Sequence, residues 1–317
     1  MGGNGGRHAP VRRRTDVDGC GCVRCQNITH DVVRRSSAAA VAWSAGFLRR
    51  HPSAVLMILG FGVLQLSLTW AGIAGEMVPD VAFAAAGVGL LGVVIGRGYV
   101  GVHATAAMRA SESQPDDGDP NTATVPHVRA SLAVTLRRLP SFLIAASAVA
   151  AVLFAVVVAV TSGLSQAVNT ALPAIGAAWA APYADSALLF ATVAILLATL
   201  VKCCFLPEAC FVGGYGPFAA IVATWRITTV HTRKAIGLTA GLLVLFLVGQ
   251  LLDAGTGAAA RPAVLEITLW GTTVTLRSVG LSTASPARLA LDAVVSAGYA
   301  AVFTQGYLRS ALETPAT

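Results

Sequence analysis

Long uncharged apolar stretches alternate along the chain with short polar or charged segments. The first of these stretches runs from Pro52 to Gly75 and carries no formal charge. A helix of about 20 apolar residues is long enough to cross the roughly 30 Å hydrocarbon layer of a bilayer. The pattern therefore predicts six membrane-spanning helices, at approximately 53–75, 81–102, 140–162, 186–206, 235–252 and 289–308.

The second, fourth and sixth predicted spans share a charge pattern. Each begins with an aspartate and ends with a base 17 positions later: Asp80 with Arg97, Asp185 with Lys202, and Asp292 with Arg309. Seventeen helical steps of 1.5 Å cover about 26 Å, close to the thickness of the hydrocarbon layer. These six residues are therefore predicted to lie at the two membrane interfaces, where long basic side chains reach the head groups. The repetition predicts three diverged two-helix hairpins.

Composition supports a membrane protein. The chain is 55% hydrophobic and only 12% charged, whereas a soluble domain carries about 25% charged residues. This small number of charges cannot cover a water-facing surface. We therefore expect an all-α integral membrane protein that forms a six-transmembrane-helix bundle. Residues 36–312 would form this membrane domain.

The net charge of +7 is unevenly placed, with nine of the 22 Lys and Arg in residues 1–50. We interpret 1–35 as a disordered basic tail, and its lack of interleaved aromatic residues argues against nucleic acid as a partner. Segments 103–139 and 202–234 are also basic, whereas the turns at 72–80 and 163–185 contain no Lys or Arg; the last outer loop, 253–288, is an exception with three arginines. The positive-inside rule then predicts a protein of the cell membrane with both termini cytoplasmic. The acidic segment 111–126 would be a cytoplasmic linker.

Three further segments have recognisable patterns. Residues 30–50 and 217–234 combine apolar residues, tryptophan and bases, which is typical of helices lying along the inner head-group layer, although each could simply extend the following span. Residues 266–277 alternate polar with apolar positions and are rich in β-branched residues. They predict a small β-hairpin on the outer face.

Four residues near the N-terminus could bind a metal. Cys20, Cys22, Cys25 and His30 offer three thiolates and one imidazole, the ligands that tetrahedral zinc prefers. The spacing departs from the usual C-x2-C knuckle, and inert free thiols are the alternative. By the predicted topology all six cysteines are cytoplasmic, where disulfides are not expected. No other cofactor is indicated.

Polar residues in or beside the spans are candidates for function. Glu208 follows Pro207 at the inner end of the fourth span, and it could pair with Arg226, Arg233 or Lys234, or face a substrate path. Gln65 and Gln305 lie within spans, where glutamines often join helices through hydrogen bonds. We find no H-E-x-x-H, G-x-S-x-G or G-x4-G-K-[ST] pattern, so no enzymatic activity is predicted.

A longer pattern resembles a known family. Its parts are Pro207–Gly214, then Ala223–Arg226, then Arg233–Leu238, in which a glutamate ends one span, a Trp-bearing helix follows and a basic pair opens the next. This resembles six-helix membrane proteins related to the membrane domain of glycerophosphoryl diester phosphodiesterases, including largely uncharacterised prokaryotic relatives. The resemblance implies a helical bundle and does not carry over the phosphodiesterase activity, because there is no room for a soluble catalytic barrel.

Three functional hypotheses follow. The first is a membrane scaffold without catalysis that interacts with lipids, with other membrane proteins or with a second copy of itself. The second is a transporter or permease subunit, since repeated hairpins often surround a central path. The third is a metal- or redox-sensing membrane protein acting through the cytoplasmic cysteines. The predominance of Arg, Ala and Gly suggests a prokaryotic source.

Overall fold

The structure, a computed structural model, describes residues 33, 36–74, 78–112, 128–174, 176, 181–255, 264–269, 272–277 and 286–314. The predicted tail, 1–35, lies outside these residues apart from Val33. The predicted linker, 111–126, lies outside them apart from its first two residues. Both predictions stay untested.

Nine helices and one pair of strands make up the described part of the chain. The helices are α1 (Ser37–Arg50), α2 (Ser53–Ala74), α3 (Val78–Glu112), α4 (Val128–Ala174), α5 (Ala181–Lys202), α6 (Leu206–Phe211), α7 (Pro217–Val230), α8 (Thr232–Gly255) and α9 (Pro286–Glu313). The strands are β1 (Val264–Leu269) and β2 (Thr272–Arg277), which pair antiparallel with Val264 opposite Arg277 and Leu269 opposite Thr272. They occupy the segment predicted as a hairpin, and its place on an outer face stays a prediction.

Four helical segments among the described residues are long and apolar enough to cross a membrane. They are Ala84–Met108, Val128–Gln166, Ser186–Phe211 and Thr232–Gly249. A fifth arises if Ala38–Arg50 and Ser53–Leu68, which meet at a bend of 79°, are counted as one broken span. The molecule is thus a helical protein with four to five candidate membrane-spanning helices. Four of the six predicted spans overlap the four candidates, and a fifth, 53–75, does so only if the bent pair is counted as one span.

The sixth predicted span, 289–308, lies in α9, which is not among these candidates. α9 packs against α1, α2, α3, α6 and α8. A helix shielded on many sides by other helices needs less apolar surface of its own than one facing lipid. A count of six spans is therefore not confirmed.

The bend between α1 and α2 has a local cause. Pro52 disfavours the helical conformation at the residue before it, and His51 accordingly has φ −124° and ψ 68°. α1 begins at a capping residue, Ser36, whose side chain accepts a hydrogen bond from the backbone N–H of Ala39 (3.1 Å). α1 thus coincides with much of the predicted interfacial segment 30–50.

α7 likewise falls within the predicted interfacial segment 217–234, as a helix separate from α8. Pro217 occupies its first turn, where a missing N–H costs no helical hydrogen bond. His231 ends it, and α8 starts one residue later. The depth of α1 and α7 in a membrane stays a prediction.

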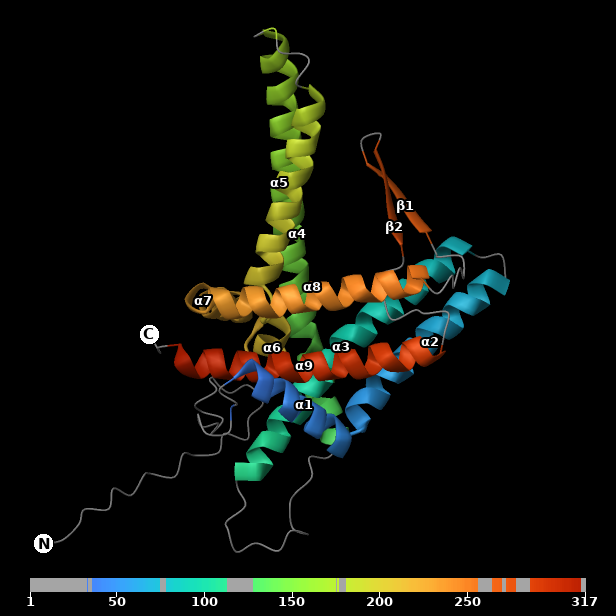
Figure 1. The fold of residues 1–317 in the computed structure, drawn as a ribbon, viewed down its shortest axis with the longest axis vertical. Helices are drawn as coiled ribbons and strands as arrows, with labels where there is room; N and C mark the ends of the chain where they lie inside the picture. The colour runs from blue at the N-terminus through green and yellow to red at the C-terminus, as the bar shows by residue number, and fades with distance from the viewer. Residues whose placement is uncertain are drawn as a thin grey trace, which may run out of the picture.

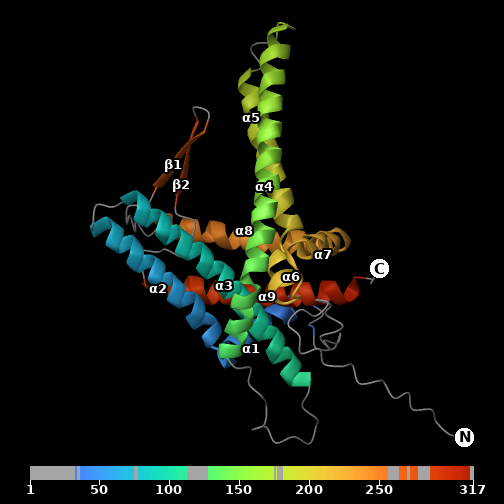
Figure 2. The ribbon, with the colours of Figure 1, turned by 180° about the vertical axis from the view of Figure 1, so that it is seen from behind.

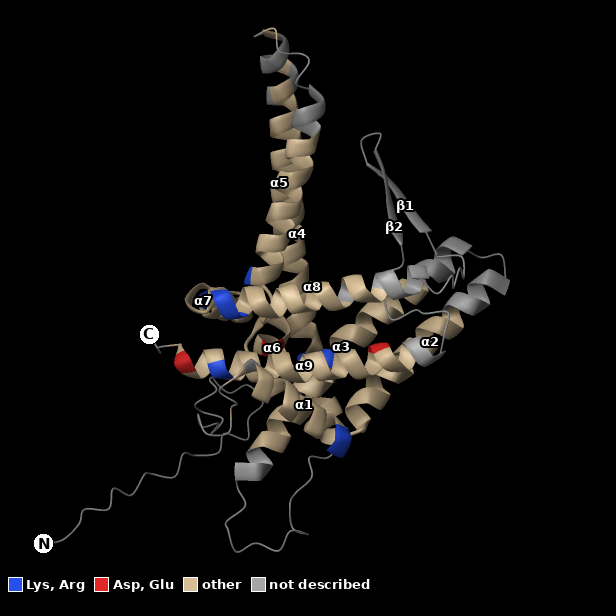
Figure 3. Ribbon diagram, viewed as in Figure 1, with Lys and Arg blue, Asp and Glu red and all other residues tan. Residues whose placement is uncertain are grey.

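The helices converge at one end of the molecule and spread apart at the other (Figure 1, Figure 2). We call α3, α6 and α9, which pack against one another, the hub. From it the α4–α5 hairpin projects well beyond α8 and α9 (Figure 1). We call its projecting part, residues 150–166 and 186–199, the arm. Figure 3 shows no charged residue along the arm.

Helices α2 and α3 approach each other closely along a line of glycines. A Cβ atom at Gly92 would lie 2.5 Å from Cβ of Phe61, and one at Gly96 would lie 2.6 Å from Cγ1 of Ile58. These distances are too short for any larger residue, so the two glycines set the separation of the hairpin. The Gly92-x3-Gly96 spacing therefore has a packing role.

The threefold repeat of hairpins is not confirmed. The α2–α3 and α4–α5 pairs are both well packed, but α8 and α9 touch only slightly, and α9 packs mainly against α1, α2 and α3. The third predicted span also begins earlier than expected: α4 starts at Val128 and continues through Arg137, Arg138 and Pro140.

Candidate functional site

The candidate site is centred on α6, the short helix of the hub. Pro207 lies in its first turn, and five of its six residues are buried: Leu206, Glu208, Ala209, Cys210 and Phe211. A proline in a first turn favours a helix start, which accounts for the break between α5 and α6. The result places an acidic side chain in the interior.

Glu208 is held there by Arg97 of α3. Arg97 Nε donates to Oε1 of Glu208 at 2.6 Å, and Arg97 Nη2 donates to Oε2 at 2.8 Å. Nη2 also donates to the carbonyl oxygen of Cys204 at 2.7 Å. The guanidinium carbon lies 4.2 Å from the ring centre of Phe303 in α9. One arginine thus joins the three helices of the hub through a bidentate ion pair and a cation–π contact.

This arrangement corrects the expected partner of Glu208. The sequence suggested Arg226, Arg233 or Lys234, all close to Glu208 along the chain, whereas the structure gives it Arg97. Only 3% of the Glu208 side chain and 21% of the Arg97 side chain are exposed. The Arg97 guanidinium therefore pairs inside the protein, and its predicted place at a membrane interface stays a prediction.

A cavity of about 200 Å³ borders the ion pair. Arg97 contributes to its lining, together with Phe142, Leu206, Thr239, Leu242 and Phe303, among others. Thr239 is 3% exposed and lies beside Cys204, with which its side chain interacts. The cavity is therefore lined mainly by apolar side chains, with the Arg97 guanidinium as its charged group.

Arg138 of α4 fastens the loop that follows α6. Its Nη1 donates to the carbonyl oxygen of Phe211 at 2.5 Å, at the end of a helix, where carbonyl groups lack intrahelical partners. Ser141 donates to the carbonyl oxygen of Tyr215 at 3.1 Å. Gly214 in this loop has φ +69°, a conformation that glycine adopts without strain. Arg138 thus holds the end of α6 in place against α4.

A second polar cluster joins α1, α3 and α4. His103 is 1% exposed; its Nε2 lies 3.3 Å from Nδ1 of His51, and its Nδ1 lies 3.1 Å from Oγ of Ser131. The ring of Tyr99 stacks on that of His103 at 5.4 Å, and the Tyr99 hydroxyl donates to Ser53 at 3.0 Å. No sequence motif points to this cluster, because two single histidines 52 positions apart give no recognisable pattern.

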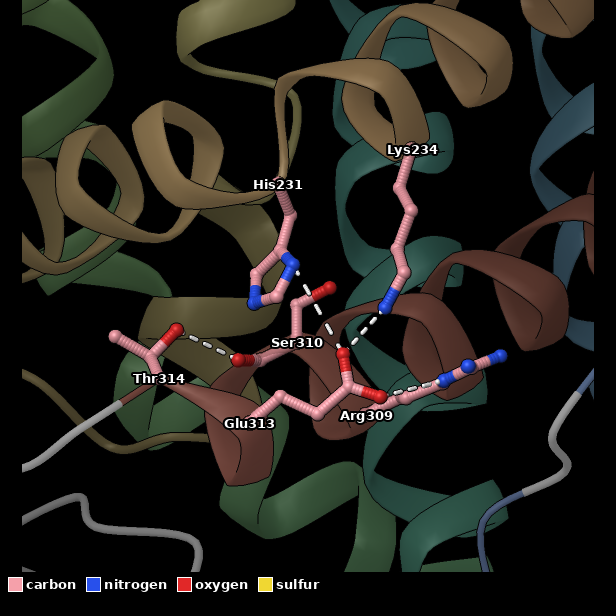
Figure 4. A network of polar contacts seen from close by, with 6 residues as sticks. All are labelled: His231, Lys234, Arg309, Ser310, Glu313 and Thr314. Carbon is pink, nitrogen blue, oxygen red and sulfur yellow. Dashed lines mark hydrogen bonds and ion pairs between the residues drawn. The ribbon is translucent and has the colours of Figure 1, made fainter.

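A third cluster joins the end of α9 to the start of α8 (Figure 4). Glu313 accepts from Lys234 Nζ at 2.5 Å and from Arg309 Nε at 2.9 Å. Partial burial by itself would raise the pKa of Glu313, but the hydrogen bonds and charges of Lys234 and Arg309 outweigh it and lower the pKa to about 2. Burial and the nearby Lys234 lower the pKa of His231, whose Nδ1 lies 3.8 Å from Glu313.

The other predicted interface residues are distributed as follows. Lys202 donates to Thr229 at 2.9 Å and lies 5.2 Å from the ring centre of Trp225. Asp292 is half-buried in α9. Asp80 and Asp185 lie in helices, but their side chains are outside the described residues. The depth of all these residues in a membrane stays a prediction.

Both candidate glutamines are buried, at 1% exposure each. Gln65 packs against Gly89 of α3, where an added Cβ would lie 2.5 Å from the glutamine Oε1. Gln305 Nε2 lies 3.1 Å from the Met108 sulfur. Each glutamine therefore contributes to helix contacts with α3 and neither lines the cavity.

The predicted metal ligands Cys20, Cys22, Cys25 and His30 lie outside the described residues. Within the described ranges, no group of three or more His, Cys, Asp or Glu side chains is arranged to hold a metal ion. Cys203, Cys204 and Cys210 are free thiols, and the last two are buried.

The fold and the site together define a helical membrane protein with a buried ion pair in its hub. Comparison with family models, with curated proteins and with solved structures found no match to this chain.

Proposed function

We propose that this protein is a non-catalytic component of a cell membrane that interacts with lipids, and through them or directly with partner proteins or a second copy of itself. The observation that carries the proposal is the contrast between arm and hub. Large apolar side chains of the arm are exposed, including Val152 (64%), Phe154 (63%) and Phe190 (73%). Such a surface is unfavourable in water and suits the hydrocarbon layer.

Two groups of paired charges support this proposal, because charges that pair with one another within the protein do not have to face the hydrocarbon layer. Arg97 pairs with Glu208, and Glu313 pairs with Lys234 and Arg309. The proposal also includes six membrane spans with both termini cytoplasmic. It further includes a relation to the membrane domain of glycerophosphoryl diester phosphodiesterases.

Lipid contact can be measured by tryptophan fluorescence in liposomes that contain brominated phospholipid, a quencher confined to the bilayer. Phe190→Trp should add fluorescence that brominated lipid quenches. Phe211→Trp, at a position that is 0% exposed, is the matched hub control and should be quenched much less. Quenching of the Phe190→Trp signal by aqueous acrylamide instead of by lipid would refute the proposal.

A transporter or permease subunit is the second candidate, favoured by the ion pair beside the cavity, since ionisable groups inside a membrane domain often lie on a transport path. Proteoliposomes that accumulate a solute, and lose this activity with Glu208→Gln, Gln65→Leu or Gln305→Leu, would establish it. The metal- or redox-sensing alternative depends on the N-terminal cysteines, and elemental analysis of purified protein without bound zinc or iron would remove its metal form.

A further inference from the structure

Lys202, the last residue of α5, lies against the exposed side of α7. We propose that Lys202 and Trp225 bind the phosphate head group of an anionic phospholipid, of the phosphatidylglycerol type, whose acyl chains lie along the apolar face of α7. This inference rests on the proposed lipid interaction and adds to it a particular site and a class of lipid.

The first step concerns the exposed face of α7. Phe218, Val222 and Trp225 follow one another at intervals of four and three residues, so they share one side of the helix. Their side chains are 69%, 67% and 55% exposed. The opposite side of α7 is buried and is formed by Ala220, Thr224, Ile227 and Thr228. An exposed apolar face that ends in a tryptophan suits acyl chains below and head groups beside the indole ring.

The second step concerns how Lys202 is held beside this face. Its Nζ donates to Oγ1 of Thr229 at 2.9 Å and lies 5.2 Å from the ring centre of Trp225, within the range of a cation–π contact. Thr229 in turn donates to the carbonyl oxygen of Trp225 at 2.7 Å. An ammonium group has three N–H donors, and Thr229 accepts from one of them. Two donors therefore remain for phosphate oxygens next to the exposed tryptophan.

The third step concerns charge, in which the two lysines of the chain differ. Lys234 is paired with Glu313 at 2.5 Å, whereas no carboxylate in the described part of the chain pairs with Lys202. Residues 209–234 contain no Asp or Glu, and basic positions lie where α7 meets α8 (Figure 3). The phosphate of phosphatidylcholine is balanced by its own choline cation, whereas an anionic lipid brings an uncompensated negative charge. The site therefore favours an anionic lipid.

The first test uses the fact that Lys202 and Lys234 are the only lysines in the sequence. The full chain is placed in nanodiscs of dioleoylphosphatidylcholine, with or without dioleoylphosphatidylglycerol, and treated briefly with acetic anhydride. Peptide mass spectrometry then gives the acetylation rate of each lysine. A bound phosphate keeps the ammonium protonated and unreactive, so phosphatidylglycerol should slow Lys202 roughly fivefold more than Lys234, the factor expected for one basic residue at an anionic membrane.

Lys234 is the internal control for the negative surface potential, which slows both lysines. Equal slowing of Lys202 and Lys234 would overturn the proposal. So would equal protection of Lys202 by soluble glycerol phosphate in nanodiscs of phosphatidylcholine alone, because the site would then take a free phosphate and not a lipid.

Two matched variants test the site without chemical labelling. Native mass spectrometry of the full chain in detergent measures the affinity for the first bound phosphatidylglycerol. Lys202→Gln should lower this affinity roughly fivefold, whereas Lys234→Gln, which removes the same charge, should leave it unchanged. An equal loss in both variants, or no loss in either, would overturn the proposal. Quenching of Phe190→Trp by brominated phosphatidylcholine, a lipid without net charge, tests the proposed function separately from this inference.

Discussion

The hub and the arm differ in a way that is opposite to the rule for soluble proteins. Ala84–Met108 lies in α3 of the hub, and half of its apolar 18-residue stretch is buried. Val128–Gln166 leads into the arm, and only 6% of its corresponding stretch is buried. Yet Val128–Gln166 is the more apolar of the two segments. In water the most apolar helix would be the most buried. The reversed order is expected where the surroundings are hydrocarbon and polar side chains must find partners inside.

Packing in the two regions follows from the same difference. The hub contains large side chains that are almost fully buried, such as Tyr99, Phe303 and Tyr307, together with its ion pair. The arm consists of two helices that run side by side and project beyond α8 and α9 (Figure 1), and many of its apolar side chains are exposed. The hub should therefore be sensitive to substitution, whereas the arm should tolerate it.

The largest effect is expected at the ion pair. Glu208→Ala leaves the charge of Arg97 buried without its partner, which should destabilise the protein by about 3–5 kcal/mol. Thermal unfolding in detergent, followed by size-exclusion chromatography, measures the loss. Phe190→Ala in the arm is the control and should change the unfolding temperature little.

The double variant Arg97→Met with Glu208→Leu sharpens this prediction. It removes both charges and should recover most of the stability, because well-packed apolar residues often replace a buried ion pair without loss. A Glu208→Ala protein as stable as wild type would show that the pair has no structural role in the hub.

An intermediate effect is expected for matched glycines. An added Cβ at Gly98 in the hub would lie 2.8 Å from Cγ of Phe211 and 2.9 Å from Cγ2 of Thr135. Gly98→Ala should therefore destabilise by roughly 1–3 kcal/mol through overpacking. Gly163 in the arm has nothing within 4 Å, so Gly163→Ala should stabilise by up to roughly 1 kcal/mol through helix propensity. Changes of the same sign at both positions in thermal unfolding would contradict the distinction between hub and arm.

The smallest effect concerns the ion cluster at the end of α9. The pKa of Glu313 is about 2, below its usual 4.5, so its ionised form stabilises the fold. This contribution is complete above about pH 4.5 and is lost as the pH falls toward 2. The side chains are about one-third exposed, so solvent screening limits it to roughly 1 kcal/mol or less. The difference in unfolding temperature between wild type and Glu313→Gln should shrink over that pH window. A difference that stays constant down to pH 2 would exclude this role.

The sequence predicted the positions of the helices more accurately than the contacts between their side chains. The apolar stretches 81–102, 140–162 and 235–252 fall on helices, and 186–206 does so as far as Lys202, because the length of an uncharged stretch is a local property. The same reasoning missed the true extent of α4, which starts at Val128 and reaches Ala174. The basic segment 103–139 was predicted to lie outside the spans, but a helix can carry bases on an exposed side as readily as a loop can.

The sequence by itself determined that the chain is helical and apolar enough for a membrane, since charge scarcity and stretch length require no knowledge of which helices meet. It also marked Glu208 as unusual. Only the tertiary structure decided that its partner is Arg97, 111 positions away, and that a cavity lies beside the pair. The physical reason is that hydropathy records how a residue interacts with its solvent, whereas the pairing of two buried charges depends on which helices pack together.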